Sequence, residues 1–199
     1  INGYEDGTFR PNNAVTRNTV VKLLGRSMQA NGYAVPEDAA QVSRFEDVAL
    51  TNDVELAQLA ALVQEEGVFI GAEGFLNGAN TMQRQHMAVV LVRAIDIMYG
   101  IDLVAQYKEA QFTSAIQDLA LAGDEEKMEA IVALEYAQIT TVETFQPTNT
   151  VTRAQFASFL HRAMDYVASQ QLDEAGALTE VDLTGATSIT IQDRAVLYA

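Results

Sequence analysis

The feature that most constrains the fold of this chain is a block of eleven residues that occurs three times. The copies are TRNTVVKLLGR (16–26), QRQHMAVVLVR (83–93) and TRAQFASFLHR (152–162). Each has an arginine at its second position and another nine residues later, and the first arginines lie 67 and then 69 residues apart. A long, nearly fixed period is typical of tandem structural repeats, in which each unit buries its apolar face against its neighbours.

Each block predicts an amphipathic helix that begins at its first arginine. At about 100° per residue, the shared apolar positions three, four, seven and eleven residues later lie on the same side as that arginine. The second arginine points the opposite way, which favours a solvated or surface-paired cation. Thr16 and Thr152 are expected N-caps, whereas Gln83 is a poorer one.

A second helix and a polar loop precede the block in the later copies. We expect these helices at about residues 53–66 and 124–136, opened by FEDV (45–48) and FTSA (112–115) respectively. The polar loops are GYEDGTF (3–9), GAEGF (71–75) and TTVETF (140–145), and measured from its phenylalanine the middle one is a residue longer. Segments 29–44 and 99–111 are expected to be connectors.

These patterns predict a mainly α chain of three helix-loop-helix units. The first unit covers residues 1–31, the second 45–98 and the third 112–168, and the first is expected to lack an upstream helix before Ile1. After Ser169 the helical periodicity stops, and residues 188–192 alternate polar with apolar side chains. We therefore expect residues 169–199 to form a linker and the first strands of a following β domain.

Composition excludes several classes of function. The chain has 12 basic and 27 acidic residues, a net charge of −15, so nucleic acid is not an expected partner. It has no cysteine, and no apolar run is long enough for a membrane span. His86 and His161 occupy different positions of the block, which favours packing or surface roles. No catalytic motif or metal-ligand spacing is present, so we expect a non-enzyme without cofactor or metal.

Three strings carry a resemblance to a known family. GYEDGTFRPNNAVTR (3–17), FEDV with the helix and GVFIG after it (45–71), and VTRAQFASFLHRA (151–163) resemble S-layer homology repeats. The resemblance covers about residues 1–168 and implies three repeats packed about a pseudo-threefold axis into a helical spindle. It further implies that grooves between repeats bind anionic secondary cell-wall polysaccharide, commonly through its pyruvylated sugar ends.

The resemblance assigns the family's conserved arginine to Arg17, Arg84 and Arg153. Each points along the buried stripe of its helix, where a charge needs a partner. One possibility is an internal carboxylate, with Asp47 as a candidate. The other is a ligand carboxylate, since a guanidinium binds it bidentately and the helix N-terminus adds amide donors and a favourable dipole.

Other candidate ligand contacts lie in the polar loops. Gly3 and Gly71 permit tight turns that let a ligand approach the backbone. Tyr4 could stack on a sugar ring and Asp6 could accept from a hydroxyl group, although an ordinary polar turn explains both equally well. The third unit has Thr140 and Thr141 where the loop glycine would be, and the chain has no tryptophan. We rank the three arginines Arg17, Arg153 and then Arg84.

The function expected from this resemblance is an extracellular anchor that holds a surface-layer protein on the bacterial cell wall. Self-association into a lattice would then use regions beyond Ala199. Two alternatives remain: the anchor module of a wall-bound exoenzyme, and a helical scaffold that binds another protein in its grooves.

Overall fold

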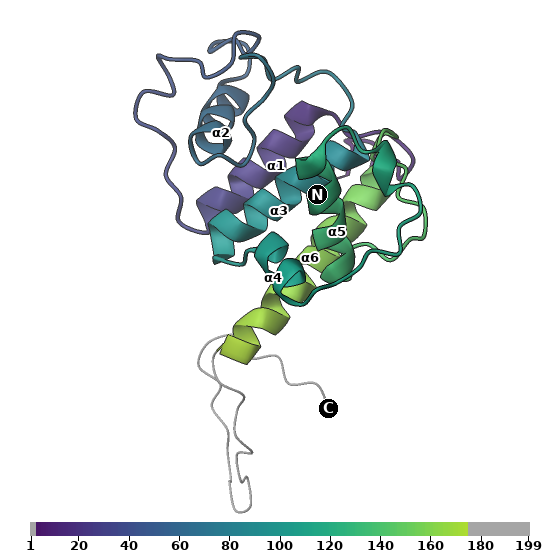
Figure 1. The fold of residues 1–199 in the computed structure, drawn as a ribbon. Coiled ribbons are helices and arrows are strands. Elements are labelled where there is room, and N and C mark those ends of the chain that lie inside the picture. The colour runs from purple at the N-terminus through teal and green to yellow at the C-terminus, as the bar shows by residue number, and fades with distance from the viewer. Residues whose placement is uncertain (1–2, 175–199) are drawn as a thin grey trace, which may run out of the picture.

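A computed structural model describes residues 3–174 as mainly helical structure (Figure 1). The helices are α1 (Arg17–Ala30), α2 (Val54–Glu65), α3 (Arg84–Tyr99), α4 (Leu103–Glu109), the 3-10 helix Leu119–Leu121, α5 (Glu125–Tyr136) and α6 (Arg153–Glu174). The mainly α fold class is therefore confirmed. The strands expected in residues 188–192 lie outside the described residues.

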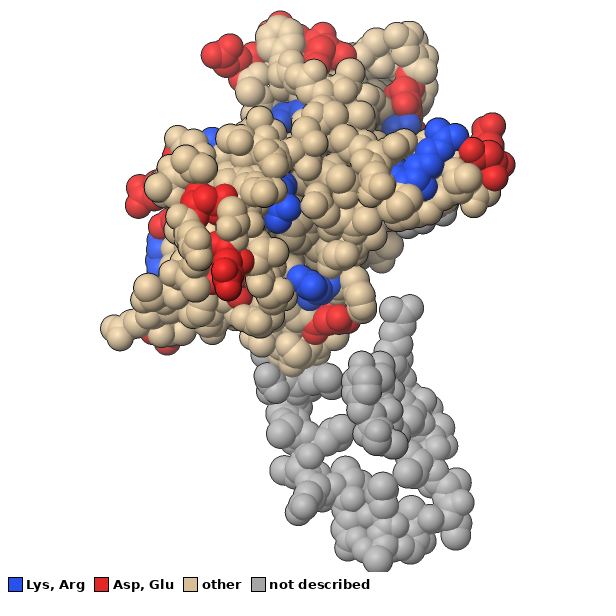
Figure 2. All heavy atoms as spheres, turned by 90° about the vertical axis from the view of Figure 1, so that its right-hand side faces the viewer, with Lys and Arg blue, Asp and Glu red and all other residues tan. Residues whose placement is uncertain are grey.

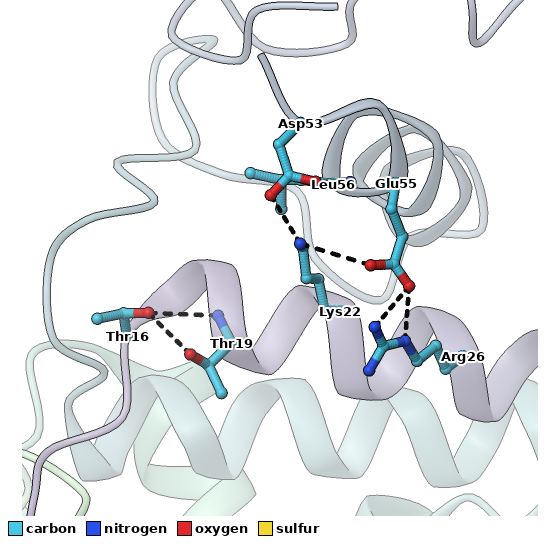
Figure 3. Close-up of polar contacts among 7 residues, drawn as sticks. All are labelled: Thr16, Thr19, Lys22, Arg26, Asp53, Glu55 and Leu56. Atoms are coloured by element: carbon cyan, nitrogen blue, oxygen red, sulfur yellow. Dashed lines mark hydrogen bonds and ion pairs between the residues drawn. The ribbon is translucent and has the colours of Figure 1, made fainter. Parts of the chain in front are cut away.

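The helices that follow the polar loops begin at the three repeated arginines, as expected. Thr16 Oγ1 accepts a hydrogen bond from the Thr19 amide at 3.3 Å (Figure 3). Thr152 Oγ1 accepts from the Gln155 amide at 3.3 Å, and Gln155 Oε1 accepts from the Thr152 amide at 3.0 Å, which completes a capping box. Gln83 makes no such bond, which confirms it as the poorer cap.

Two expected boundaries are wrong. Segment 99–111 is not only a connector, because it contains α4, whose start is capped by Asp102 and whose Leu103 is fully buried. The last helix does not stop at Ser169 but continues to Glu174. By contrast, the helices expected at 53–66 and 124–136 are confirmed as α2 and α5, with Asp53 and Asp124 as their N-caps.

The helices pack so that the arginine-led helix of one unit covers the upstream helix of the next. Thus α1 packs on α2 and α3 packs on α5, while α4 packs on α5 and α6 packs on α3. Between α1 and α2, Lys22 Nζ pairs with Asp53 at 2.6 Å and Arg26 pairs with Glu55 at 2.6 Å (Figure 3). This confirms the surface-paired role expected of Arg26.

Helices α1, α3 and α6 meet around one apolar cavity of about 180 Å³. Leu24, Leu91 and Leu160 all line it, and each lies seven residues after the first arginine of its helix. The stripe predicted from the repeated block is therefore the surface through which these three helices converge.

The segments that lead into these helices hydrogen-bond in a closed ring. The Met82 amide donates to Val15 O at 2.9 Å, Val151 N to Met82 O at 2.8 Å, and Val15 N to Val151 O at 2.9 Å. Each of these buried residues lies two positions before its arginine. Each of the three segments is thus bonded to the other two.

The arginine contacts fix the register of the loops. Arg17 Nε donates to Leu76 O and Arg153 Nε donates to Phe9 O. Leu76 lies eight residues before Arg84, and Phe9 lies eight residues before Arg17. Leu76, not Phe75, is therefore the counterpart of Phe9, so the expectation of a longer middle loop is wrong.

Candidate functional site

A groove lies where the first turn of α1 faces α3 and the loop after α2. It has a volume of about 260 Å³, and Arg17 lines it together with Phe69 and Gly71 from the loop and His86 from α3. Arg17 and His86 also border a neighbouring hollow of about 420 Å³. The structure therefore brings two predicted site residues, Arg17 and Gly71, into one groove between the first and second units.

The Arg17 side chain makes one hydrogen bond and one aromatic contact. Its Nε donates to Leu76 O at 2.6 Å, and its guanidinium carbon lies 4.7 Å from the centre of the Phe69 ring. Burial lowers the pKa of Arg17 from its ordinary value, and the negative charge of Asp47 partly opposes that change. Within residues 3–174 its two terminal nitrogens make no hydrogen bond or ion pair. The fork of the guanidinium is thus open to a ligand.

Asp47 does not pair directly with Arg17, which corrects one of the two alternatives. Its carboxylate accepts hydrogen bonds from the amides of Leu76 and Asn77, each at 2.7 Å. Asn77 has a positive φ of 54°, so the carboxylate holds a tight turn. Because the carbonyl of Leu76 binds Arg17, Asp47 positions the arginine through the backbone.

The third unit repeats this arrangement. Asp118 accepts from the amides of Phe145 and Gln146, each at 2.7 Å, and Gln146 has a φ of 55°. The counterpart of FEDV is therefore residues 116–119, four residues after the expected FTSA. A signal was present in the sequence, since Asp47 and Asp118 each lie six residues before the aspartate that caps the next helix.

The helix N-termini do not offer the free amides that we expected. In α1, the Arg17 amide donates to Asn80 O and the Asn18 amide to Gly78 O, both at 2.9 Å. The first two amides of α3 and α6 are likewise bonded, to the carbonyls of Asn149, Pro147, Asn13 and Pro11. The first two amides of each helix are therefore not available to an anion, whereas the helix dipole still favours one.

Gly71 takes a conformation that other residues rarely adopt. Its φ is +71°, and a Cβ atom there would lie 2.5 Å from Phe75 O and 2.6 Å from Phe45 Cε1. Glycine is therefore required for this loop to form the wall of the groove.

Comparison with known families bears on two parts of the chain. The family model of the S-layer homology domain matches residues 1–18 and 124–157. These two segments are similar to the S-layer homology domain. The resemblance noted above is thus confirmed there, and the match points to anchoring at the cell wall rather than to catalysis. No curated protein matches the chain.

The matched segments contain Arg17 and Arg153, the two arginines that we ranked highest. Arg153 Nε donates to Phe9 O at 2.9 Å, and its guanidinium carbon lies 4.8 Å from the Tyr4 ring and 5.0 Å from the Phe9 ring. Both rings are partly exposed, at 37% and 38%. The matched segment 1–18 thus supplies aromatic faces beside the arginine of the matched segment 124–157.

Gly3 and Asp6, two further predicted site residues in the matched segment 1–18, shape the turn in that segment. Asp6 pairs with Arg10 at 2.7 Å, and hydrogen bonds from Thr8 and then Arg10 lower the pKa of its carboxyl. The Tyr4 amide donates to Thr8 O at 2.8 Å, and a Cβ on Gly3 would lie 3.1 Å from the same oxygen. Asp6 is therefore already engaged within the turn.

Arg84, which lies outside the matched segments, is in a different environment. It is only 8% exposed, and its guanidinium carbon lies 4.8 Å from the Phe145 ring and 5.9 Å from the Phe159 ring. Its Nε is buried without a hydrogen-bond partner, and burial lowers its pKa while the charge of Asp118 opposes this. Arg84 is thus a buried arginine between two aromatic rings, whereas Arg17 lies in a groove.

Further charged side chains line the Arg17 groove. Arg93 pairs with Glu126, and Lys127 pairs with Asp124. The expected surface pairing of the second arginine is thus confirmed for Arg93, although Arg93 also faces the groove. Figure 2 shows basic side chains scattered singly over one face of the molecule, most of them close to acidic ones. On that face the cations form local sites and not one extended patch.

Among residues 3–174, no helix is long and apolar enough to cross a membrane. The same part of the chain contains no group of three or more metal-binding side chains.

Proposed function

We propose that this chain is a non-catalytic module that binds an anionic secondary cell-wall polysaccharide and so anchors a surface-layer protein to the bacterial cell wall. The observation that carries the proposal is the open guanidinium fork of Arg17 in a groove between two units. Its Nε is fixed by Leu76 O, while its terminal nitrogens have no partner in the described residues.

The ligand chemistry that fits this groove is a carboxylate on a sugar ring. A guanidinium binds a carboxylate through two parallel hydrogen bonds, and a pyruvate ketal on a terminal sugar provides such a carboxylate. Phe69, Val89 and Val90 line the same groove and offer apolar surface to the sugar face and to the ketal methyl group. The carboxylate would lie against Arg17 and the ring against the apolar wall.

The ring of hydrogen bonds through Val15, Met82 and Val151 supports three equivalent units about a pseudo-threefold axis. By this equivalence Arg153 marks a second binding site. There the Tyr4 ring lies beside the arginine, as the Phe69 ring lies beside Arg17. Arg84 ranks last because it is buried, with only 8% of its surface exposed. We place the protein outside the cell, at the cell wall.

The net charge of −15 does not oppose this function strongly. The Debye length is about 8 Å at physiological salt, so carboxylates distant from the groove are screened from a bound anion. The cost falls on the association rate, since a chain this acidic does not steer an anionic polymer toward the groove.

The test is a pull-down of the purified chain with cell-wall sacculi before and after acid removal of the wall polymer. We expect the chain to sediment with intact sacculi and to stay in the supernatant with stripped ones. Equal sedimentation with both would contradict polysaccharide binding and would favour a peptidoglycan or protein partner.

A further inference from the structure

His86 lies in the same groove as Arg17 but belongs to a different unit. It is in the first turn of α3 and lines both the 260 Å³ groove and the adjoining 420 Å³ hollow, each time together with Arg17. The side chain is half-buried, and within residues 3–174 its imidazole makes no hydrogen bond. A ligand carboxylate bound by Arg17 therefore enters a space whose wall includes an unbonded imidazole.

The charged groups around His86 belong to helices α1, α3 and α5 and to the residue that caps α5. Arg17 faces it from α1, and Lys127 and the Asp124 carboxylate face it from the start of α5. Arg93 and Glu126 line the same groove and pair with each other. Burial lowers the pKa of His86, the charges of Arg17 and Lys127 lower it further, and Asp124 opposes them. In the empty groove the imidazole is accordingly neutral at neutral pH.

We propose that His86 is a second anion contact of this groove, and that a ligand carboxylate binds there together with a proton taken up on the imidazole. The inference rests on the function proposed above and adds a residue and a pH dependence to it. The reason is electrostatic: burial disfavours the imidazolium form most, and the charges of Arg17 and Lys127 disfavour it further. A carboxylate between Arg17 and His86 offsets the Arg17 charge and adds a negative charge beside the imidazole, so the imidazolium form gains stability.

This contact is particular to the Arg17 groove. The positions equivalent to His86, two residues after the first arginine, are Thr19 in α1 and Gln155 in α6. Both take part in capping their own helix, Thr19 through its amide to Thr16 and Gln155 through its side chain to Thr152. A site at Arg153 would therefore bind with no comparable proton uptake.

The sign of the pH dependence follows from linkage. Ligand binding raises the pKa of His86. Affinity is therefore highest at pH values below the pKa that His86 has without ligand, and it falls as pH rises toward the pKa that His86 has with ligand bound. The ketal carboxylate stays ionised throughout this range, because ordinary carboxyl pKa values lie near 4 or below. We expect affinity to be at least about threefold higher at pH 5.5 than at pH 7.5, and linkage to one proton limits the change to tenfold per pH unit.

The experiment is calorimetric titration with a disaccharide whose terminal sugar carries a pyruvate ketal, at pH 5.5, 6.5 and 7.5. The expected result is pH-dependent affinity in the unmodified protein and in His161→Gln, and constant affinity in His86→Gln. His161 is a matched control because it is exposed on α6, where it pairs with Asp165 at 3.3 Å. The chain has only two histidines, so proton NMR of the imidazoles can also follow His86 directly, with and without the disaccharide.

The outcomes separate this inference from the proposed function. Binding that is weakened in Arg17→Lys but does not change with pH in the unmodified protein, with an unmoved His86 titration midpoint, would overturn the role of His86 alone. An absence of binding at every pH would overturn both. A rise of the His86 midpoint on adding the disaccharide supports the inference even if His86→Gln is poorly folded.

Discussion

Replacing Asp47 by asparagine tests how the Arg17 groove is held in place. The Asp47 carboxylate accepts from two successive amides, Leu76 and Asn77, each at 2.7 Å. Asparagine has one acceptor oxygen and one donor amide, so it can satisfy one of these amides and turns a donor toward the other. The turn that carries the Leu76 carbonyl should therefore loosen.

The size of the effect can be worked from these contacts. A hydrogen bond to a charged group contributes about 1.5–3 kcal/mol, and Asp47 is exposed, so we take about 1.5–2 kcal/mol for the lost bond. For a domain of this size that corresponds to a fall in Tm of roughly 3–8 °C. Arg17 would regain side-chain freedom that costs about 0.5–1.5 kcal/mol on binding, which weakens ligand affinity roughly 2- to 10-fold.

Asp118→Asn is the matched control. Asp118 makes the same two bonds in the third unit, to Phe145 and Gln146, but its turn faces Arg84 and not the Arg17 groove. Thermal unfolding by circular dichroism should show a similar loss of stability in both variants. Titration with the pyruvylated disaccharide should show weaker binding in Asp47→Asn and an affinity within about twofold of the unmodified protein in Asp118→Asn. Equal affinities in the two variants would refute the positioning role of Asp47.

Two further changes address the loops and the helix caps. Gly71→Ala should destabilise the fold by about 2–4 kcal/mol in denaturant unfolding, because it adds a clash with Phe75 O to the cost of a positive φ. Gly7→Ala is the control, because Gly7 has a φ of +76° and no atom would lie within 4 Å of an added Cβ. Gly7→Ala should destabilise the fold by only about 1–2 kcal/mol, and equal losses in the two variants would contradict the steric reasoning. Asp53→Ala should cost about 1 kcal/mol through the lost cap of α2. The pKa of Asp53 is lowered from 3.8, first by the hydrogen bond from Lys22, so the contribution of Asp53 to stability should be constant from pH 5 to 7 and should shrink as pH falls below about 4. A contribution that grows below pH 4 would contradict this reasoning.

The sequence predicted the helices well because their signals are local. Thr16 and Thr152 cap the expected helices, Asp53 and Asp124 cap the upstream ones, and the apolar stripe of the block is the surface on which α1, α3 and α6 converge. Each of these depends on residues within one or two turns of the same helix, where spacing decides which face is buried.

The loops were harder to predict because their register is set by contacts between units. Phe75 was aligned with Phe9 because both are phenylalanine, yet the counterpart of Phe9 is the buried Leu76. This loop position requires only a large apolar side chain and a backbone carbonyl that can accept from the arginine, as Leu76 O does from Arg17. The amides at the start of α1 are occupied by carbonyls more than fifty residues away, Asn80 and Gly78, and no local pattern shows such contacts.

Sequence reasoning also missed His86 as a groove residue. His86 and His161 occupy different positions of the repeated block, so the sequence shows no repeated histidine site. That difference does not bear on a groove that is formed by two units. The position became informative only once α3 was seen to face Arg17 across the groove.

The most direct test of the central claim is titration of Arg17→Lys/Arg153→Lys with the pyruvylated disaccharide, with circular dichroism on the same samples. Lysine keeps the charge but loses the bidentate geometry, at a cost of roughly 1.5–3 kcal/mol per site, so we expect affinity to fall at least about tenfold while the helical spectrum is unchanged. Arg26→Lys, on the opposite face of α1 and paired with Glu55, should bind as the unmodified protein does. Unchanged affinity in a folded Arg17→Lys/Arg153→Lys protein would contradict the account, and the protein-binding scaffold would then explain the grooves better.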